Sequence, residues 1–209
     1  MIYLVGGAPR CGKTSFAQYA CREFGIPWIS TDVLMSVARA YLSPDEIAER
    51  LPHVKSLGAT NDEVYANNSI ATIIDHYKTK QRGTVPAIKA LIADTVKERY
   101  TFLLEGGHLF PELIHELLEE YGTDLIRSVV LVRSDTSGLA NAFTQSTAEY
   151  DWAVAKTHNP ETYAKIAEMV REFSAFFMEG AEKFKLPLVK TDGDLSQNFP
   201  TITAHLGVR

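Results

Sequence analysis

The chain has 209 residues, 45% of them hydrophobic and 22% charged, which is ordinary globular composition, and the length fits one α/β domain with a substantial core. Acidic residues outnumber basic ones by 26 to 21, and a formal net charge of −5 argues against nucleic acid as the main partner. No apolar run approaches the roughly 20 residues that span a bilayer. The two cysteines, Cys11 and Cys21, do not suggest a disulfide framework, and the N-terminus lacks a secretory pattern. We therefore expect a soluble cytoplasmic protein without a membrane partner.

The first motif along the chain is the most specific one. An apolar run, Ile2–Val5, precedes a glycine-containing loop, and a helix-compatible segment follows from Lys13. Residues 7–14 match the phosphate-loop pattern G-x-x-x-x-G-K-[ST] in the strand-to-helix context that the pattern requires. The backbone N–H groups of such a loop point inward and form an anion site at the start of the helix. We predict that the phosphates of ATP are bound here, by Gly7, Ala8, Pro9, Arg10, Cys11, Gly12, Lys13, Thr14 and Ser15.

Two side chains at the end of this loop have chemical roles of their own. Lys13 reaches the terminal phosphates as a point charge, so we predict that it is catalytic. The Thr14 hydroxyl is predicted to ligate the Mg²⁺ that accompanies the nucleotide. The alternative is a glycine-rich turn without a ligand. We interpret Cys11 as a small loop filler rather than as a reactive thiol.

Strands and helices alternate along the rest of the chain. The predicted elements are helix 13–24, strand 26–30, helix 33–41, a helix beginning at Ser43, helix 62–80, helix 84–100, strand 101–105, helix 111–121, strand 127–133, helix 161–185, strand 186–190 and a closing helix from Leu195. Five strands alternating with helices predict a parallel sheet covered on both faces. Within a single domain of residues 1–209, we interpret residues 33–83 as a helical insertion on the acceptor side and the weakly patterned residues 134–160 as a lid.

Carboxylates stand at two strand ends, on the edge where open α/β sheets bind ligands. Asp32 follows the second strand and Glu105 ends the third. Neighbouring strands lie about 4.8 Å apart, so a carboxylate beside the loop reaches the metal, and one a strand further out, about 10 Å away, faces an acceptor molecule. We therefore assign Glu105 to the metal and Asp32 to the proton of an attacking hydroxyl. The structural alternatives are a salt bridge for Glu105 and a helix N-cap for Asp32.

Phosphoryl transfer also needs cations around the moving group. Arg133 begins the predicted lid, and we predict that it is catalytic rather than a solvated strand end. Lys156, Lys165 and Arg171 are weaker candidates. Arg39, Lys80 and Arg82 in the insertion are candidates for binding an anionic acceptor, although such side chains are usually solvated. We leave His108, which follows two glycines, without a role because a lone histidine is more often structural.

Three segments carry a resemblance to a known family: residues 6–15, Ser30–Asp32, and Leu104–Leu109 with Pro111. They resemble the P-loop small-molecule kinases of the nucleoside monophosphate kinase-like superfamily, and most closely 2-phosphoglycerate kinase and its relatives. The resemblance implies a three-layer P-loop NTPase fold with sheet order 2-3-1-4-5, the use of ATP and Mg²⁺, and transfer of the γ-phosphate to a hydroxyl of a small anionic metabolite similar to 2-phosphoglycerate. Such kinases usually carry several lid arginines, whereas residues 134–170 contain none.

Two other classes of function remain open on the sequence alone. One is a P-loop NTPase that hydrolyses nucleotide without a small-molecule acceptor, although the chain has no N-K-x-D motif. The other is a nucleotide-binding module without turnover, which the absence of arginine from the predicted lid leaves open.

Overall fold

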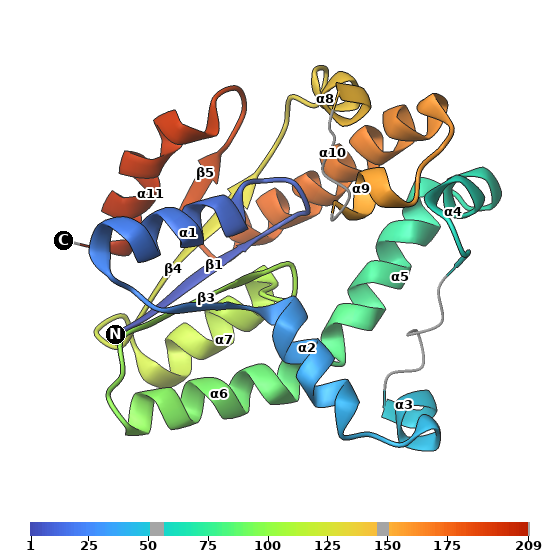
Figure 1. Ribbon diagram of the computed structural model, residues 1–209. Coiled ribbons are helices and arrows are strands. Elements are labelled where there is room, and N and C mark those ends of the chain that lie inside the picture. The colour runs from blue at the N-terminus through green and yellow to red at the C-terminus, as the bar shows by residue number, and fades with distance from the viewer. Residues whose placement is uncertain (51–56, 146–150, 209) are drawn as a thin grey trace.

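The computed structural model describes residues 1–50, 57–145 and 151–208 (Figure 1). Residues 51–56 of the predicted insertion and 146–150 of the predicted lid therefore lie outside the described residues. Within the described part, one parallel sheet has the order β2-β3-β1-β4-β5, as the resemblance implies. Its strands are β1 (Ile2–Gly7), β2 (Trp28–Ser30), β3 (Phe102–Gly106), β4 (Ile126–Val132) and β5 (Leu188–Lys190).

The sheet register decides which side chains meet at its carboxyl edge. Val5 of β1 pairs with Glu105 of β3, and Ser30 of β2 pairs with the same glutamate from the other side. The phosphate loop, which follows Gly7, is thus one strand away from Glu105 and two strands away from the residue after Ser30. This arrangement agrees with the spacing expected from the sequence.

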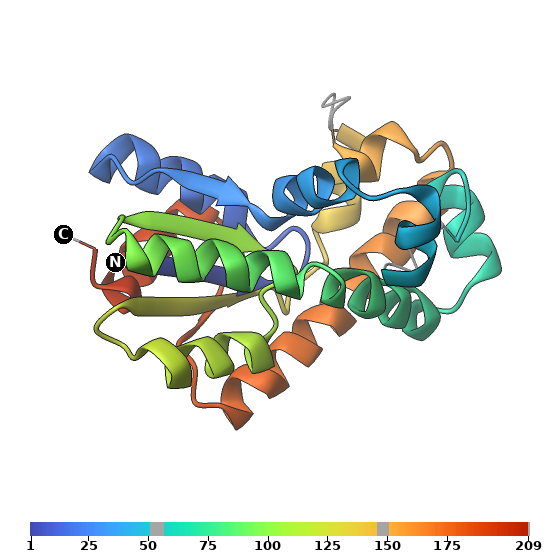
Figure 2. The same cartoon turned by 90° about the horizontal axis from the view of Figure 1, so that it is seen from below.

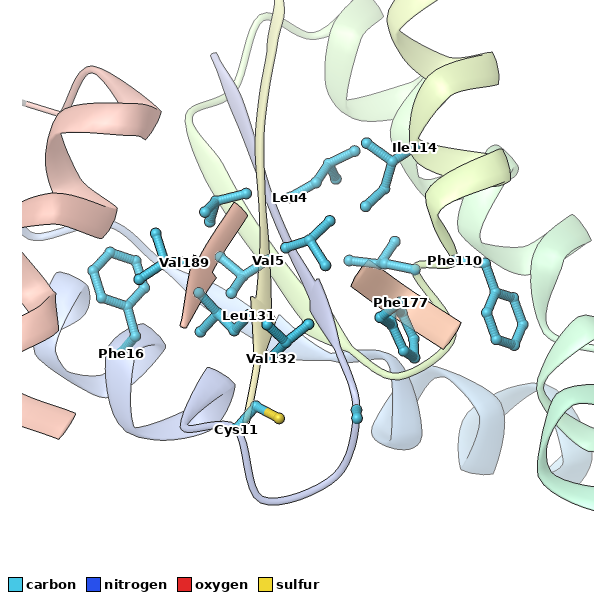
Figure 3. Close-up of a cluster of buried hydrophobic side chains, with 14 of the residues drawn as sticks. Leu4, Val5, Cys11, Phe16, Phe110, Ile114, Leu131, Val132, Phe177 and Val189 are labelled. Carbon is cyan, nitrogen blue, oxygen red and sulfur yellow. The ribbon is translucent and has the colours of Figure 1, made fainter. Parts of the chain in front are cut away.

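Helices cover both faces of the sheet. On one face, α1 (Lys13–Phe24) and α11 (Phe199–Leu206) meet through the stacked rings of Tyr19 and Phe199, 4.6 Å apart. On the other face lie α6 (Val85–Lys97), α7 (Pro111–Tyr121) and α10 (Pro160–Lys183). Figure 3 shows the result, with Leu131 and Val132 of β4 between Phe16 on one side and Phe177 on the other. The closing helix begins with a short 3₁₀ turn, Leu195–Asn198, before α11.

The described residues of the predicted insertion form α2 (Thr31–Ala40), α3 (Pro44–Arg50), α4 (Asn61–Asn67) and α5 (Ile70–Arg82). The prediction of one helix over residues 62–80 is wrong, because the chain leaves the helical conformation at Asn68. The Asn68 side-chain amide donates to the Val64 carbonyl, and the Ser69 hydroxyl accepts from the Thr72 N–H at 3.1 Å. Polar side chains that satisfy backbone groups in this way end one helix and begin the next.

The predicted lid contains α8 (Leu139–Gln145) and α9 (Trp152–Ala155). The buried ring of Phe143 packs 5.6 Å from that of Tyr163 on α10. Figure 2 shows that α4, α5, α8 and α9 all lie beyond the carboxyl ends of the strands. The fold therefore places the insertion and the lid around one edge of the sheet, and the other edge is left to the turns that connect helices to strands.

Candidate functional site

The phosphate loop has the backbone of an anion-binding nest. Gly7, Arg10 and Gly12 have positive φ angles of 143°, 63° and 83°. Residues with positive and negative φ thus alternate along the loop, which is the backbone pattern that directs successive N–H groups toward one anion. Gly7 must be glycine, since a Cβ there would lie 2.0 Å from the Leu131 carbonyl oxygen. No side chain caps the start of α1, which leaves its first N–H groups for a ligand. The Cys11 thiol is buried beside Ser174, and burial raises its pKa, which fits a loop filler.

Lys13 lies inside the loop. Its ammonium group donates to the Ala8 carbonyl oxygen at 2.6 Å, and the residue is only 9% exposed. The positive charge is therefore held against the backbone of the phosphate loop. The position agrees with the role predicted from the sequence, which stays a prediction.

The predicted metal ligands, Thr14 and Glu105, are neighbours. The Thr14 hydroxyl donates to Glu105 Oε1 at 3.1 Å, although the residues are 91 positions apart. Glu105 is 2% exposed; its burial raises the pKa of the carboxyl group, while the charge of Lys13 and hydrogen bonds with Thr14 and Ser30 oppose the rise. The salt-bridge alternative is not supported, because the hydrogen-bond partner of Glu105 is a hydroxyl group.

These two oxygen donors fit Mg²⁺, which is usually bound through one or two protein oxygens together with phosphates and water. Among the described residues, no group of three or more His, Cys, Asp or Glu side chains could hold a metal ion by itself. The remaining ligands of a metal at this position would come from water or from the phosphates of a nucleotide.

Asp32 lies at the same edge, in the first turn of α2. The Ser30 hydroxyl accepts from the Asp32 N–H at 3.2 Å, so Ser30 is the N-cap and the capping interpretation of Asp32 is wrong. The Asp32 carboxylate is exposed and lines the same cleft as Lys13 and Glu105. It is thus available to a substrate rather than used by the backbone.

Two buried side chains, which the sequence did not reveal as a pair, meet next to Asp32. Thr31 is fully buried, and its hydroxyl lies 2.7 Å from His108 Nδ1. His108 is 1% exposed; burial lowers its pKa to about 4, with Lys80 and Lys13 acting in the same direction and Asp32 against it. The imidazole is therefore neutral at pH 7. The signal in the sequence was the short Gly-Gly-His turn after β3, but its partner 77 residues earlier was not predictable from it.

Cationic side chains from more than one element line the cleft. Arg133 is half-buried, with its Nε buried and without a partner among the described residues, so it is not a solvated strand end. Lys80 of α5 lines the cleft, and its pKa is lowered by burial and by the charges of Arg39 and Lys156, while Asp32 raises it. Two weaker candidates lie elsewhere: Lys165 donates to the Tyr65 carbonyl oxygen, and Arg171 lies 4.0 Å from Glu168 in an exposed pair.

The phosphate loop, Asp32, Lys80, Glu105 and Arg133 line one cleft of about 1090 Å³. The phosphate loop lines it, and so do residues of α4, α5 and the predicted lid, including Tyr65, Tyr77, Gln81 and Trp152. Ligand pockets for small molecules measure roughly 300–1,000 Å³. The cleft is large enough for a nucleotide and a second, smaller molecule side by side.

Solved structures with the same architecture cover nearly the whole chain. A shikimate kinase from Bacteroides thetaiotaomicron has a TM-score of 0.55 at 11% identity, with 99% of this chain and 98% of that chain covered. A gluconokinase from Sinorhizobium meliloti 1021 has a TM-score of 0.54 at 15% identity, with 98% and 90% covered. The chain has the fold of these kinases. An uncharacterized protein from Eubacterium ventriosum ATCC 27560 has a TM-score of 0.52 at 14% identity, with 100% and 99% covered.

These likenesses concern the fold. No family model matches the sequence, and no curated protein matches it significantly. The three structures do not include a 2-phosphoglycerate kinase, so that closer likeness stays a prediction. Among the described residues, none of the helices combines the length and the apolar character that crossing a membrane would need.

Proposed function

We propose that this protein is an ATP-dependent kinase that transfers the γ-phosphate of ATP to a hydroxyl group of a small anionic metabolite. The observation that carries the proposal is that the Asp32 carboxylate shares one cleft with Lys13, Thr14 and Glu105. A base, a phosphate-binding cation and a pair of metal ligands are the groups that this transfer needs.

In the proposed reaction the acceptor oxygen attacks the γ-phosphorus, and the bond from that phosphorus to the β–γ bridging oxygen breaks, releasing ADP. Asp32 accepts the proton of the attacking hydroxyl. Lys13 and the amides of the loop hold the phosphates and stabilise charge on their oxygens. Mg²⁺, held by Thr14 and Glu105, supplies further charge neutralisation when bound. Arg133 follows β4, whereas Asp32 follows β2, so Arg133 contributes a cation on the side of the phosphate loop away from Asp32.

The part of the cleft that α4, α5 and the predicted lid line favours a small, polar and anionic acceptor. Lys80 and Lys156 line it, and Arg39 lies close enough to affect the pKa of Lys80. The Tyr65 hydroxyl and Gln81 Oε1 are buried without a hydrogen-bond partner among the described residues. Buried polar groups normally have partners, so unpaired ones beside a cleft favour a hydroxylated or carboxylated ligand. A protein that only hydrolysed nucleotide would not need this second half of the cleft.

Two variants test the proposal, once an acceptor has been found by thermal-shift screening of phosphorylated acids, sugars and nucleosides with a non-hydrolysable ATP analogue. Lys13→Ala should abolish transfer, because the charge on the terminal phosphates is lost. Asp32→Asn should lower kcat by at least about 100-fold while the Kd for ATP changes little. Asp94→Asn, on an exposed part of α6, is the matched control.

Two outcomes would contradict this assignment. Equal losses of kcat and ATP affinity in Asp32→Asn would show that Asp32 does not face the acceptor. Acceptor-independent ATP hydrolysis as the only activity would favour the NTPase alternative, and ATP binding without turnover on any acceptor would favour the binding module.

A further inference from the structure

The lid supplies few cations to the cleft. Residues 134–170 contain no arginine and two lysines, Lys156 and Lys165. Lys165 donates to the backbone carbonyl of Tyr65 at 3.0 Å and does not line the cleft. Lys156 lines the cleft and, among the described residues, is the one cation that residues 134–170 bring to it. Transfer of a phosphoryl group concentrates negative charge on the phosphate oxygens, so a second cation close to the loop, from another element, would stabilise that charge further.

Arg10 of the phosphate loop offers such a cation. Its guanidinium NH1 donates to Asp151 Oδ2 of the lid at 2.6 Å, across 141 positions of the chain. Its Cζ lies 4.7 Å from the ring centroid of Phe143, which is 1% exposed. One edge of the guanidinium is thus held by a carboxylate and one face by an aromatic ring.

The backbone at Arg10 indicates that the side chain has a purpose. Arg10 has a φ of 63°, in the left-handed region where a Cβ is unfavourable and glycine is preferred. Strained residues of this kind concentrate at functional sites. The loop conformation could be formed more easily with glycine, so the position keeps a side chain at a conformational cost.

Asp151 is itself fixed in place. Its side chain is 8% exposed, and Oδ1 accepts from the Ala153 N–H at 3.1 Å, which caps α9. The Asn61 amide donates to the Trp152 carbonyl oxygen at 2.9 Å, and the Asn61 N–H to the Lys156 carbonyl oxygen at 2.9 Å. The Asp151 carboxylate is therefore fixed by its hydrogen bond within the lid, and the neighbouring lid backbone is hydrogen-bonded to α4.

We propose that Arg10 is the cation that contacts the terminal phosphate of the nucleotide from the lid side, and that Asp151 is the residue that positions it. A guanidinium has five N–H donors, and among the described residues only Asp151 accepts from this one, at NH1. Arg10 also lines the cleft, where a nucleotide phosphate could accept from its other donors. This inference rests on the proposed function, because it requires a nucleotide on the loop.

The test compares the Kd values of MgATP and MgADP by calorimetry in three main variants, with Arg10→Lys and Lys13→Ala as two further ones. Arg10→Gly keeps the left-handed backbone and removes only the side chain. Because it leaves the buried Asp151 without its cation, the double variant R10G/D151N, which also removes that charge, isolates the phosphate contact. Asp151→Asn alone keeps Arg10 but releases its guanidinium. Thermal unfolding of each nucleotide-free variant shows whether the lid and the loop remain folded.

We expect R10G and R10G/D151N to bind MgATP at least about tenfold more weakly, as for loss of a hydrogen bond to a charged group, with a smaller loss for MgADP. D151N should also reduce the preference for MgATP over MgADP, but by less. Arg10→Lys, which keeps a positive charge at this position, should retain more of that preference than R10G does. The nucleotide-free double variant should unfold close to the wild-type temperature.

Two results would overturn the proposal. Wild-type Kd values in R10G/D151N would show that Arg10 makes no phosphate contact. Equal losses for MgATP and MgADP, together with a lower unfolding temperature, would show that the ion pair only anchors the lid. Lys13→Ala separates these failures from failure of the proposed function, because it should lose nucleotide binding in either case, and wild-type binding by Lys13→Ala would refute the proposed function itself.

Discussion

Gly106, at the end of β3, offers a quantitative test of how the sheet supports the candidate base. Its φ is +153°, and a Cβ at this position would lie 1.8 Å from Thr31 Oγ1 and 2.9 Å from Thr31 Cβ. Thr31 directly precedes Asp32 and is hydrogen-bonded to His108. Gly106→Ala should therefore displace the first turn of α2 and the carboxylate that it carries.

The size of the effect follows from three contributions. The backbone conformation costs about 1–2 kcal/mol for a residue with a Cβ. Forcing a methyl group into a packed site costs about 1–3 kcal/mol, and loss of the hydrogen bond from Thr31 to His108 costs about 1 kcal/mol. We expect the free energy of unfolding to fall by about 3–6 kcal/mol, out of a typical total of about 5–15 kcal/mol.

The assay is equilibrium unfolding in urea, with Gly122→Ala as the matched control. Gly122 also has a positive φ, +79°, but a Cβ there has no atom within 4 Å, so this variant reports backbone strain alone, about 1–2 kcal/mol. Adding Thr31→Ala to Gly106→Ala removes the Oγ1 and Cγ2 contacts and should recover part of the difference. The reasoning is refuted if Gly106→Ala and Gly122→Ala lose the same stability.

Three further predictions concern single side chains of the site. Glu105→Gln should weaken MgATP binding about tenfold or more, but ATP without Mg²⁺ should bind as well or better because a negative charge is gone; calorimetry with and without the metal decides. The pKa of His108 is lowered from 6.5 to about 4 in the fold, so between these pH values the unfolded chain binds more protons than the folded one. The free energy of unfolding should therefore decrease by roughly 3 kcal/mol as the pH falls from 6.5 to about 4. His108→Asn should flatten the urea-unfolding profile over that range, and an unchanged slope would contradict the buried neutral imidazole. Burial raises the pKa of the Cys11 thiol, whereas Cys21 is exposed, so a thiol reagent such as DTNB should label one cysteine rapidly in the native protein, and Cys21→Ser should remove that reaction.

The features that were predicted correctly from the sequence are those encoded by contiguous residues. The phosphate loop depends on eight neighbouring positions, Gly7 to Thr14, whose glycines and lysine have their effect within one turn of chain. The strands were found because each is a short apolar run. The positions of Asp32 and Glu105 followed from the rule that parallel strands end at one edge, once the strand order was supplied by the family resemblance.

Contacts between distant segments were decided by the tertiary structure alone. His108 and Thr31 meet only because β3 pairs with β2, and Arg10 meets Asp151 only because the lid folds back over the loop. The side chains at Asn68 and Ser69 were visible in the sequence, yet the apolar spacing on both sides is the same for one helix or two. A local pattern determines which conformations a segment favours, whereas the partners of a buried polar group depend on where every other segment has packed.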